Sequence, residues 1–171
     1  PNGTNIVLPV GTPYTVTPSS AGDYHITVDY SGDDNYNPVG RELTLKVNKI
    51  DAGFASSANV NVVVYGGSVS LNSSVADPLA SGTVSYRFDA GAPAELNHAL
   101  GDVIVYTPRE AGVRNVTVSY SGDANFNNAT RLIQIVVVKS DASGFDCVAV
   151  PDVIDLDQST RLVSNVTNAN A

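Results

Sequence analysis

The feature that most constrains this chain of 171 residues is an internal repeat. The segment from Thr17 to Phe54 recurs from Thr107 to Phe145, at a spacing of 90 residues that becomes 91 at the closing phenylalanine. The matching positions are aromatic, glycine, asparagine, arginine and apolar residues: Tyr30 with Tyr120, Gly32 with Gly122, Asn35 with Asn125, Arg41 with Arg131 and Val47 with Val137. A repeat of this length indicates that each copy is one structural unit that stacks on similar neighbours.

The repeat divides the chain into three predicted domains. Residues 50–140 form one complete unit, residues 1–49 correspond to the C-terminal part of a preceding unit, and residues 141–171 to the N-terminal part of a further one. A weaker echo at a spacing of 91, which pairs Leu71 with Leu162, supports the last assignment. Two explanations stay open: a segment of a longer array, or a chain whose tail completes the head of the next. A first residue that is proline and the absence of Met favour a processed product or an excised piece.

Apolar residues alternate with polar ones along most segments, which is typical of strands with one buried face. In the complete unit the pattern predicts strands near 51–56 and 60–65, 68–76, 82–88, 93–97, 102–107, 113–120 and 130–138. Turn residues separate these runs, and no window predicts a helix. With 51–56 and 60–65 counted as one strand, seven strands in a unit of this length fit an immunoglobulin-like sandwich. The linkers 46–52 and 137–142 are neither Gly/Ser-rich nor Pro-rich, which favours a stiff string of units.

The most specific motif is Tyr-Ser-Gly-Asp-x-Asn-(Tyr/Phe)-Asn, which occurs as Tyr30–Asn37 and Tyr120–Asn127. It resembles the tandem immunoglobulin-like repeats of large bacterial and archaeal surface proteins and adhesin-like proteins. The resemblance covers residues 17–54 and 51–145. It implies an all-β fold of tandem immunoglobulin-like β-sandwiches, with one complete and two partial repeats in this chain. It also implies display on a cell surface in a stalk or filament, sometimes with adhesion, and it carries over no catalytic residues.

Charge excludes nucleic acid as a partner. Nine Lys and Arg stand against seventeen Asp and Glu, which gives a net charge of −8 and an isoelectric point near 4.4. Binding to phosphates requires clustered Lys and Arg, and an anionic membrane surface would repel the chain as well. No run of about 18 apolar residues is present, so we expect no membrane insertion in this segment.

Two acidic groups are weak candidates for a Ca²⁺ site, because Ca²⁺ prefers oxygen ligands. The first is Asp33 and Asp34 in the motif, and the second is Asp155 and Asp157, which a strand would place on one face. The second copy of the motif has Ala124 in place of Asp34. The preferred interpretation is therefore that the aspartates cap backbone amides or face solvent, and that the chain has no metal and no cofactor.

Five Asn-x-Ser/Thr sequences are candidates for glycosylation: Asn2, Asn72, Asn115, Asn128 and Asn165. About three would arise by chance in a chain of this composition, so the excess is mild. Alternation places Asn72 and Asn115 on outward faces, and Asn128 lies in a predicted exposed hairpin. Glycans would suit a surface protein, and chance matches in an Asn- and Thr-rich chain are the alternative.

No enzyme is expected. His25 is predicted to face solvent and His98 to lie in a loop, and there is no triad order, His-x-x-x-His pair or phosphate-binding loop. The single cysteine, Cys147, is interpreted as a small buried apolar residue or as the partner of a cysteine outside this segment.

The expected function is a non-enzymatic structural module of an extracellular stalk, adhesin or filament. The expected partners are neighbouring repeats or copies of the same chain, and host or cell-surface glycans or proteins. One alternative is a filament subunit assembled by strand or half-domain complementation between chains. A second is a carbohydrate-binding module, for which Tyr14, Tyr24 and Tyr65 are the tyrosines predicted to be free.

Overall fold

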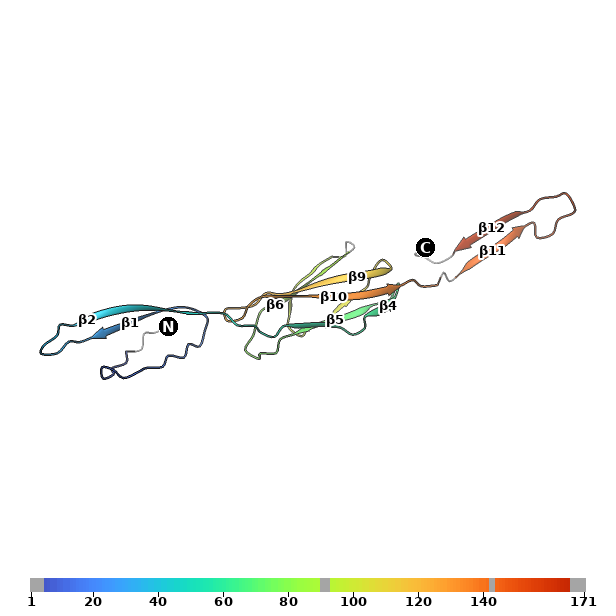
Figure 1. Ribbon diagram of the computed structural model, residues 1–171. Coiled ribbons are helices and arrows are strands. Elements are labelled where there is room, and N and C mark those ends of the chain that lie inside the picture. Colours follow the sequence, from blue (N-terminus) through green and yellow to red (C-terminus); the bar gives the residue numbers. More distant parts are fainter. Residues whose placement is uncertain (1–4, 90–92, 142–143, 167–171) are drawn as a thin grey trace.

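The fold of the chain is all-β. The computed structural model describes residues 5–89, 93–141 and 144–166, and these contain twelve strands in four sheets and no helix. The strands fall into three parts that follow one another along the molecule (Figure 1). The prediction of an all-β chain is confirmed.

The central part contains two sheets. Its strands are β3 (Ala55–Ala58), β4 (Val62–Val64), β5 (Val69–Ser74), β6 (Thr83–Phe88), β7 (Glu95–Ala99), β8 (Ile104–Tyr106), β9 (Gly112–Tyr120) and β10 (Ala129–Val138). One sheet has the order β4-β10-β9-β6-β7 and the other the order β3-β5-β8. All pairs are antiparallel except β4 with β10.

The core lies between these two sheets. The alternation in the sequence places every second residue of a strand on the inner face, and the buried side chains follow it: Val69, Leu71, Val84, Tyr86, Ile104, Tyr106, Val116, Val118, Tyr120, Ile133, Ile135 and Val137. The rings of Phe54 and Tyr120 stack at 5.3 Å between centroids. Ser73, on β5, is buried as well, and its hydroxyl forms a hydrogen bond of 2.8 Å with the hydroxyl of Tyr86 on β6 of the other sheet. The sheets therefore share one closed core.

The N-terminal part repeats the β9–β10 hairpin without its cover. Strands β1 (Gly22–Tyr30) and β2 (Val39–Val47) pair from Gly22–Val47 to Tyr30–Val39. That register is the one of β9 and β10 moved by 90 residues. The inner face is open here, because Val28 is 54% exposed where its counterpart Val118 is fully buried.

The C-terminal part repeats the β3–β5 pair. Strands β11 (Phe145–Val150) and β12 (Arg161–Val166) are antiparallel, and Ala149 pairs with Leu162 as Ala58 pairs with Leu71. The spacing of both pairs is 91 residues. Leu162 is 73% exposed although Leu71 is buried. Matching backbone registers thus occur at both ends of the chain, but the opposing sheet packs only in the central part of the described residues.

The first predicted strand of the complete unit, 51–56, starts late in the structure, at Ala55. Asp51 accepts a hydrogen bond from the amide of Gly53, and Gly53 has a φ of 66° that extended strands do not adopt. The carbonyl of Ala52 accepts the amides of Ala76 and Asp77 instead of joining a ladder. This segment is therefore a turn that still places Ala52 and Phe54 in the core.

The two hairpins give a matched mutational test. Val118→Ala removes two buried carbons and leaves a cavity, so we expect it to lower the free energy of unfolding of the central part by about 2 kcal/mol. Val28→Ala, at the equivalent exposed position, should change that transition by less than about 0.5 kcal/mol. Urea denaturation of the 171-residue chain followed by circular dichroism measures both. Equal effects would contradict the unequal burial of the two faces.

Candidate functional site

The turn between β9 and β10 is the strongest candidate site, because the sequence motif folds into a defined arrangement there. One carboxylate oxygen of Asp123, Oδ1, accepts the amides of Asn125 and Phe126 at 2.8 and 2.9 Å. The amide of Asp123 donates to the carbonyl of Phe126. Gly122 has a φ of 68°, and a Cβ there would lie 2.6 Å from the carbonyl oxygen of Phe126. The turn therefore requires both the glycine and the aspartate.

The second oxygen of Asp123 connects this turn to the start of β6. Its Oδ2 accepts the amide and the hydroxyl of Ser81 at 2.7 and 2.8 Å. The hydroxyl of Tyr120 donates to the carbonyl of the same serine. The amides of Ser81 and Asn125 are the main reason why the pKa of Asp123 falls to about 2. The motif thus fixes where β6 enters the sheet.

The same turn also contacts the preceding part of the chain. The amide of Ile50 donates to the carbonyl of Asn125 at 3.0 Å, and the amide of Asn127 donates to the carbonyl of Ile50 at 2.8 Å. The side-chain oxygen of Asn125 accepts the amide of Ala21, just before β1, at 2.9 Å. Lys49 donates its ammonium group to the carbonyl of Asp123. We call residues 21, 49, 50 and 123–127 the junction.

The first copy of the motif folds in the same way but has different partners. Oδ1 of Asp33 accepts the amides of Asn35 and Tyr36 at 2.8 and 2.9 Å, as in the second copy. Its Oδ2 accepts the hydroxyl of Tyr30 at 2.7 Å, and that bond is the main reason why the pKa of Asp33 is lowered. Tyr36 is 70% exposed, whereas its counterpart Phe126 is buried.

Comparison of the sequence with models of known protein families and with curated proteins found no match. The functional interpretation of the chain therefore depends on its own residues and their geometry.

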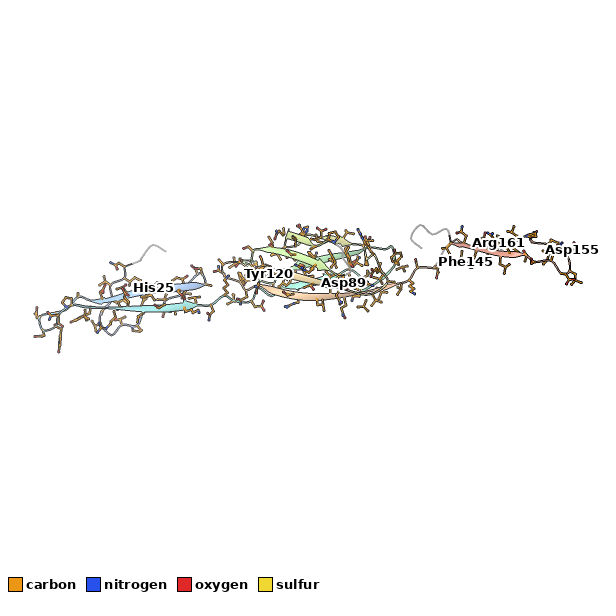
Figure 2. The ribbon with its side chains drawn as sticks, turned by 90° about the horizontal axis from the view of Figure 1, so that it is seen from above. His25, Asp89, Tyr120, Phe145, Asp155 and Arg161 are labelled. Atoms are coloured by element: carbon orange, nitrogen blue, oxygen red, sulfur yellow. The ribbon has the colours of Figure 1, made fainter. Side chains whose placement is uncertain are left out.

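The acidic candidates are placed apart. Asp33 caps its turn, Asp34 follows it in the same exposed loop, and neither lies near the C-terminal pair. Asp155 and Asp157 do not share a strand face, so that prediction is wrong. Pro151 has no amide to continue the ladder, β11 ends before it, and Asp157 has a φ of 66°. Figure 2 shows Asp155 at the far end of the C-terminal hairpin. No group of three or more potential metal ligands occurs among the described residues.

The glycosylation candidates differ in access. Asn72 and Asn128 are exposed, on β5 and after the junction turn, and Asn165 is exposed on β12. Asn115 is half-buried, and its side-chain oxygen accepts a bond of 3.1 Å from Gln134. Asn2 lies outside the described residues. The geometry therefore leaves Asn72 and Asn128 as the most accessible acceptors in the central part.

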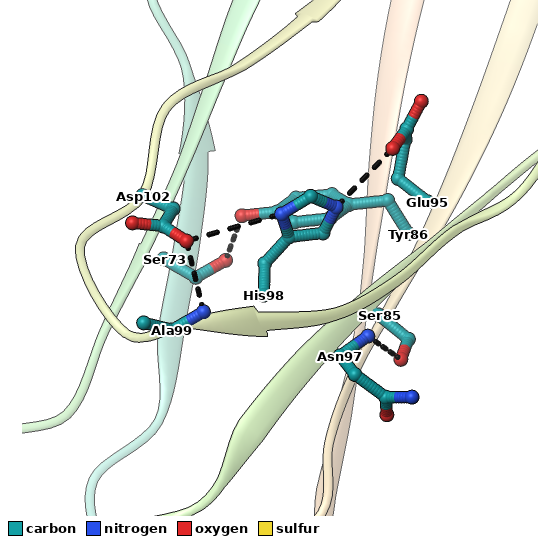
Figure 3. A network of polar contacts seen from close by, with 8 residues as sticks. All are labelled: Ser73, Ser85, Tyr86, Glu95, Asn97, His98, Ala99 and Asp102. Carbon is teal, nitrogen blue, oxygen red and sulfur yellow. Dashed lines mark hydrogen bonds and ion pairs between the residues drawn. The ribbon is translucent and has the colours of Figure 1, made fainter.

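The histidines lie far apart in the fold. His25 is exposed on β1, as predicted, and its Nδ1 is 3.4 Å from the hydroxyl of Thr44 (Figure 2). His98 lies in strand β7 and not in a loop, so that prediction is wrong. It is held between two carboxylates, with Nε2 3.2 Å from Glu95 and Nδ1 3.8 Å from Asp102 (Figure 3).

Sequence reasoning missed this cluster around His98, although the spacing Glu-x-x-His-x-x-x-Asp is visible. Asp102 also accepts the amide of Ala99 at 2.9 Å, which closes the turn after β7 (Figure 3). The hydroxyl of Ser73 bonds to Tyr86 and Ser56, and the ring of Tyr86 lies edge-on to that of His98, with 6.4 Å between the ring centroids. Through the bond from the Ala99 amide to Asp102, the cluster holds the end of β7.

Cys147 is exposed and free, so its interpretation as a buried apolar residue is wrong. It lies on β11, which no other sheet opposes among the described residues. Among the tyrosines considered for glycan binding, Tyr14 is 57% exposed, while Tyr24 and Tyr65 are half-buried. An open depression of the central part is lined by no aromatic residue: its lining is Ser56, Ser57, Ala58, Asn61, Leu132, Ile133 and Gln134. The described residues contain no helix with the length and apolar character of a membrane span.

The pKa of Asp123 gives a pH test. Because it falls from 3.8 to about 2 on folding, the ionised carboxylate stabilises the central part above about pH 4, and this contribution is lost as the pH falls through 2. Asp123→Asn should lower the urea midpoint at pH 5, and its deficit relative to the unmodified chain should shrink towards pH 2. Asp33→Asn, outside the central part, is the control and should leave this transition unchanged. A deficit that is the same at both pH values would contradict the assignment.

Proposed function

We propose that this chain is a non-enzymatic structural module of a cell-surface stalk, adhesin or filament that is built from tandem immunoglobulin-like repeats. The junction carries the proposal. Val47 ends β2, and three residues later Ile50 already bonds to the turn of the next unit. Consecutive units that share main-chain hydrogen bonds have little freedom to bend, which suits a part that transmits force or sets reach.

The strand order supports the immunoglobulin-like assignment. The N-terminal strand region of the central part contributes β3 to one sheet and β4 to the other, where β4 runs parallel to the last strand, β10. The remaining order, with β5 beside β8 and β10-β9-β6 in sequence, is the one that two packed Greek-key sheets of this class have. Phe54 and Tyr86 fill the centre between the sheets.

The net charge and the exposed Asn-x-Ser/Thr sequences support an extracellular location. A net charge of −8 keeps an extended protein soluble and discourages binding to anionic surfaces. Asn72 and Asn128 are exposed acceptor positions on the unit that is complete, so glycans there would not disturb the core. A carbohydrate-binding module has less support, since the depression lined by Ser56, Asn61 and Gln134 has no aromatic platform for a sugar ring.

The stiffness of the junction is testable by spin-label distances. With Cys147→Ser, labels at Glu42→Cys and Arg87→Cys, both exposed, report the separation of the N-terminal and central parts. We expect a narrow distribution that broadens with Asn125→Ala, because the bond to Ala21 is lost. Asn35→Ala, the same residue in the first turn, should leave it narrow. A distribution that is broad before any change at the junction would contradict a stiff array.

The surface location is tested separately. Antibodies against the 171-residue chain should label intact source cells without permeabilisation, because the proposed module is displayed outside the membrane. Intact mass of the native material before and after deglycosylation identifies glycans on it. Labelling that appears only after permeabilisation would contradict the extracellular assignment.

A further inference from the structure

Two polar groups of the first motif bond to each other where their counterparts bond to another strand. In the central part, Tyr120 and Asp123 both hold Ser81, the residue that leads into β6. In the N-terminal part, the hydroxyl of Tyr30 donates to Oδ2 of Asp33 instead. The Tyr30 hydroxyl and the Asp33 carboxylate therefore correspond to the two groups that bind Ser81 in the central part. Without such a serine, they bond to each other.

The edge of β1 that faces away from β2 indicates which strand would pair there. β9 pairs with β10 on one side and with β6 on the other, where Ser85 lies opposite Ser119 and Tyr86 opposite Val118. β1 has the sequence and register of β9, yet it pairs with β2 alone within the described part of the chain. Its second edge is open at Asp29, the counterpart of Ser119.

The residues before β1 also lack partner strands, and one of these partners is the β6-type strand. Residues 5–9 and 14–16 are the counterparts of β7 and β8, but they form no strand. In the central part β7 pairs with β6 alone and β8 with β5 alone. Both segments thus lack the strand on which their own pairing depends. The apolar face of the hairpin is open as well, with Leu43 55% and Val28 54% exposed.

We propose that the β1 edge, with Tyr30 and Asp33, is a docking site for a β6-type strand that begins with Ser-Gly. The serine would take the amide and hydroxyl contacts to Asp33 and the carbonyl contact to Tyr30, and the strand would run antiparallel to β1. The glycine is required because Gly82 has a φ of 114° and a Cβ on it would lie 2.6 Å from the carbonyl oxygen of Gly122.

The occupant is the β6-type strand of a further repeat unit, outside residues 1–171. A second copy cannot supply the strand while folded, because its β6 is the centre of its own core, with Val84 and Tyr86 buried. Its β11 and β12 have the registers of β3 and β5, so they do not replace β6 either. This inference rests on the proposed tandem-repeat architecture.

Disulfide trapping tests the register. A copy of residues 50–90 is placed before Pro1, Cys147 is changed to Ser, and Ser85→Cys in the added copy is combined with Asp29→Cys. We expect a disulfide, because the two positions are opposite each other in the central part. Thr27→Cys in place of Asp29→Cys should give none, since diagonal neighbours are about 7–8 Å apart. Ser85→Cys with Ser119→Cys in the central part is the positive control.

The outcomes separate the inference from the proposed function. The docking site is overturned if the Asp29→Cys disulfide does not form, or if Thr27→Cys gives an equal yield. This holds even when the control disulfide in the central part forms and the spin-label distance distribution across the junction is narrow. In the unextended chain, Ser85→Cys with Asp29→Cys should give no covalent dimer. A dimer would overturn the proposed source, because it would show that a second copy supplies the strand.

Tyr30→Phe measures the contact itself. In the extended chain it should shift the unfolding equilibrium of the N-terminal unit about fivefold, which is the effect of one hydrogen bond of about 1 kcal/mol. In the unextended chain it should leave unfolding unchanged, since Tyr30 then bonds only to exposed Asp33. An equal effect in both chains, or no effect in either, overturns the proposal.

Discussion

Burial of one face of the β9–β10 hairpin is the constraint on which the rest of the structure depends. Val118 and Ile135 are fully buried in a core that they share with Phe54 and with Val69 and Leu71 of β5. The hydrophobic contribution of such a face requires both halves of a unit, since a lone two-stranded hairpin is marginal in water. The exposed β1–β2 pair has the register of β9–β10, and the exposed β11–β12 pair has the register of β3–β5. Neither pair is covered by an opposing sheet among the described residues.

The Asp123 turn also connects the central part of the chain to the N-terminal part. One carboxylate oxygen orders the turn and the other orders the start of β6, so a single side chain joins the local hairpin to the sheet. The carbonyl and side chain of Asn125 then reach Ile50 and Ala21 of the preceding segment. The same eight-residue motif therefore orders the sheet of the central part and connects this part to the N-terminal part.

Much of this architecture could be predicted from the sequence, because alternation fixes which residues face inward and the repeat fixes the units. The pattern Val84, Tyr86 was sufficient to place β6 in the core. Contacts between distant residues were not predictable in this way. Nothing in the sequence indicates that Asp123 accepts hydrogen bonds from Ser81, and the spacing of Glu95, His98 and Asp102 does not by itself place His98 on a strand. Asp155 and Asp157 do not lie on a strand, because β11 ends before Pro151, which has no amide to continue the ladder.

The most direct measurement is amide hydrogen exchange of the two equivalent hairpins in the unmodified chain. The account predicts strong protection throughout β9 and β10, and much weaker protection in β1 and β2, above all for the β1 amides that face away from β2. Equal protection of the two hairpins would show that the hairpin is stable without an opposing sheet, and would contradict the dependence on cover that is proposed for every unit of the array.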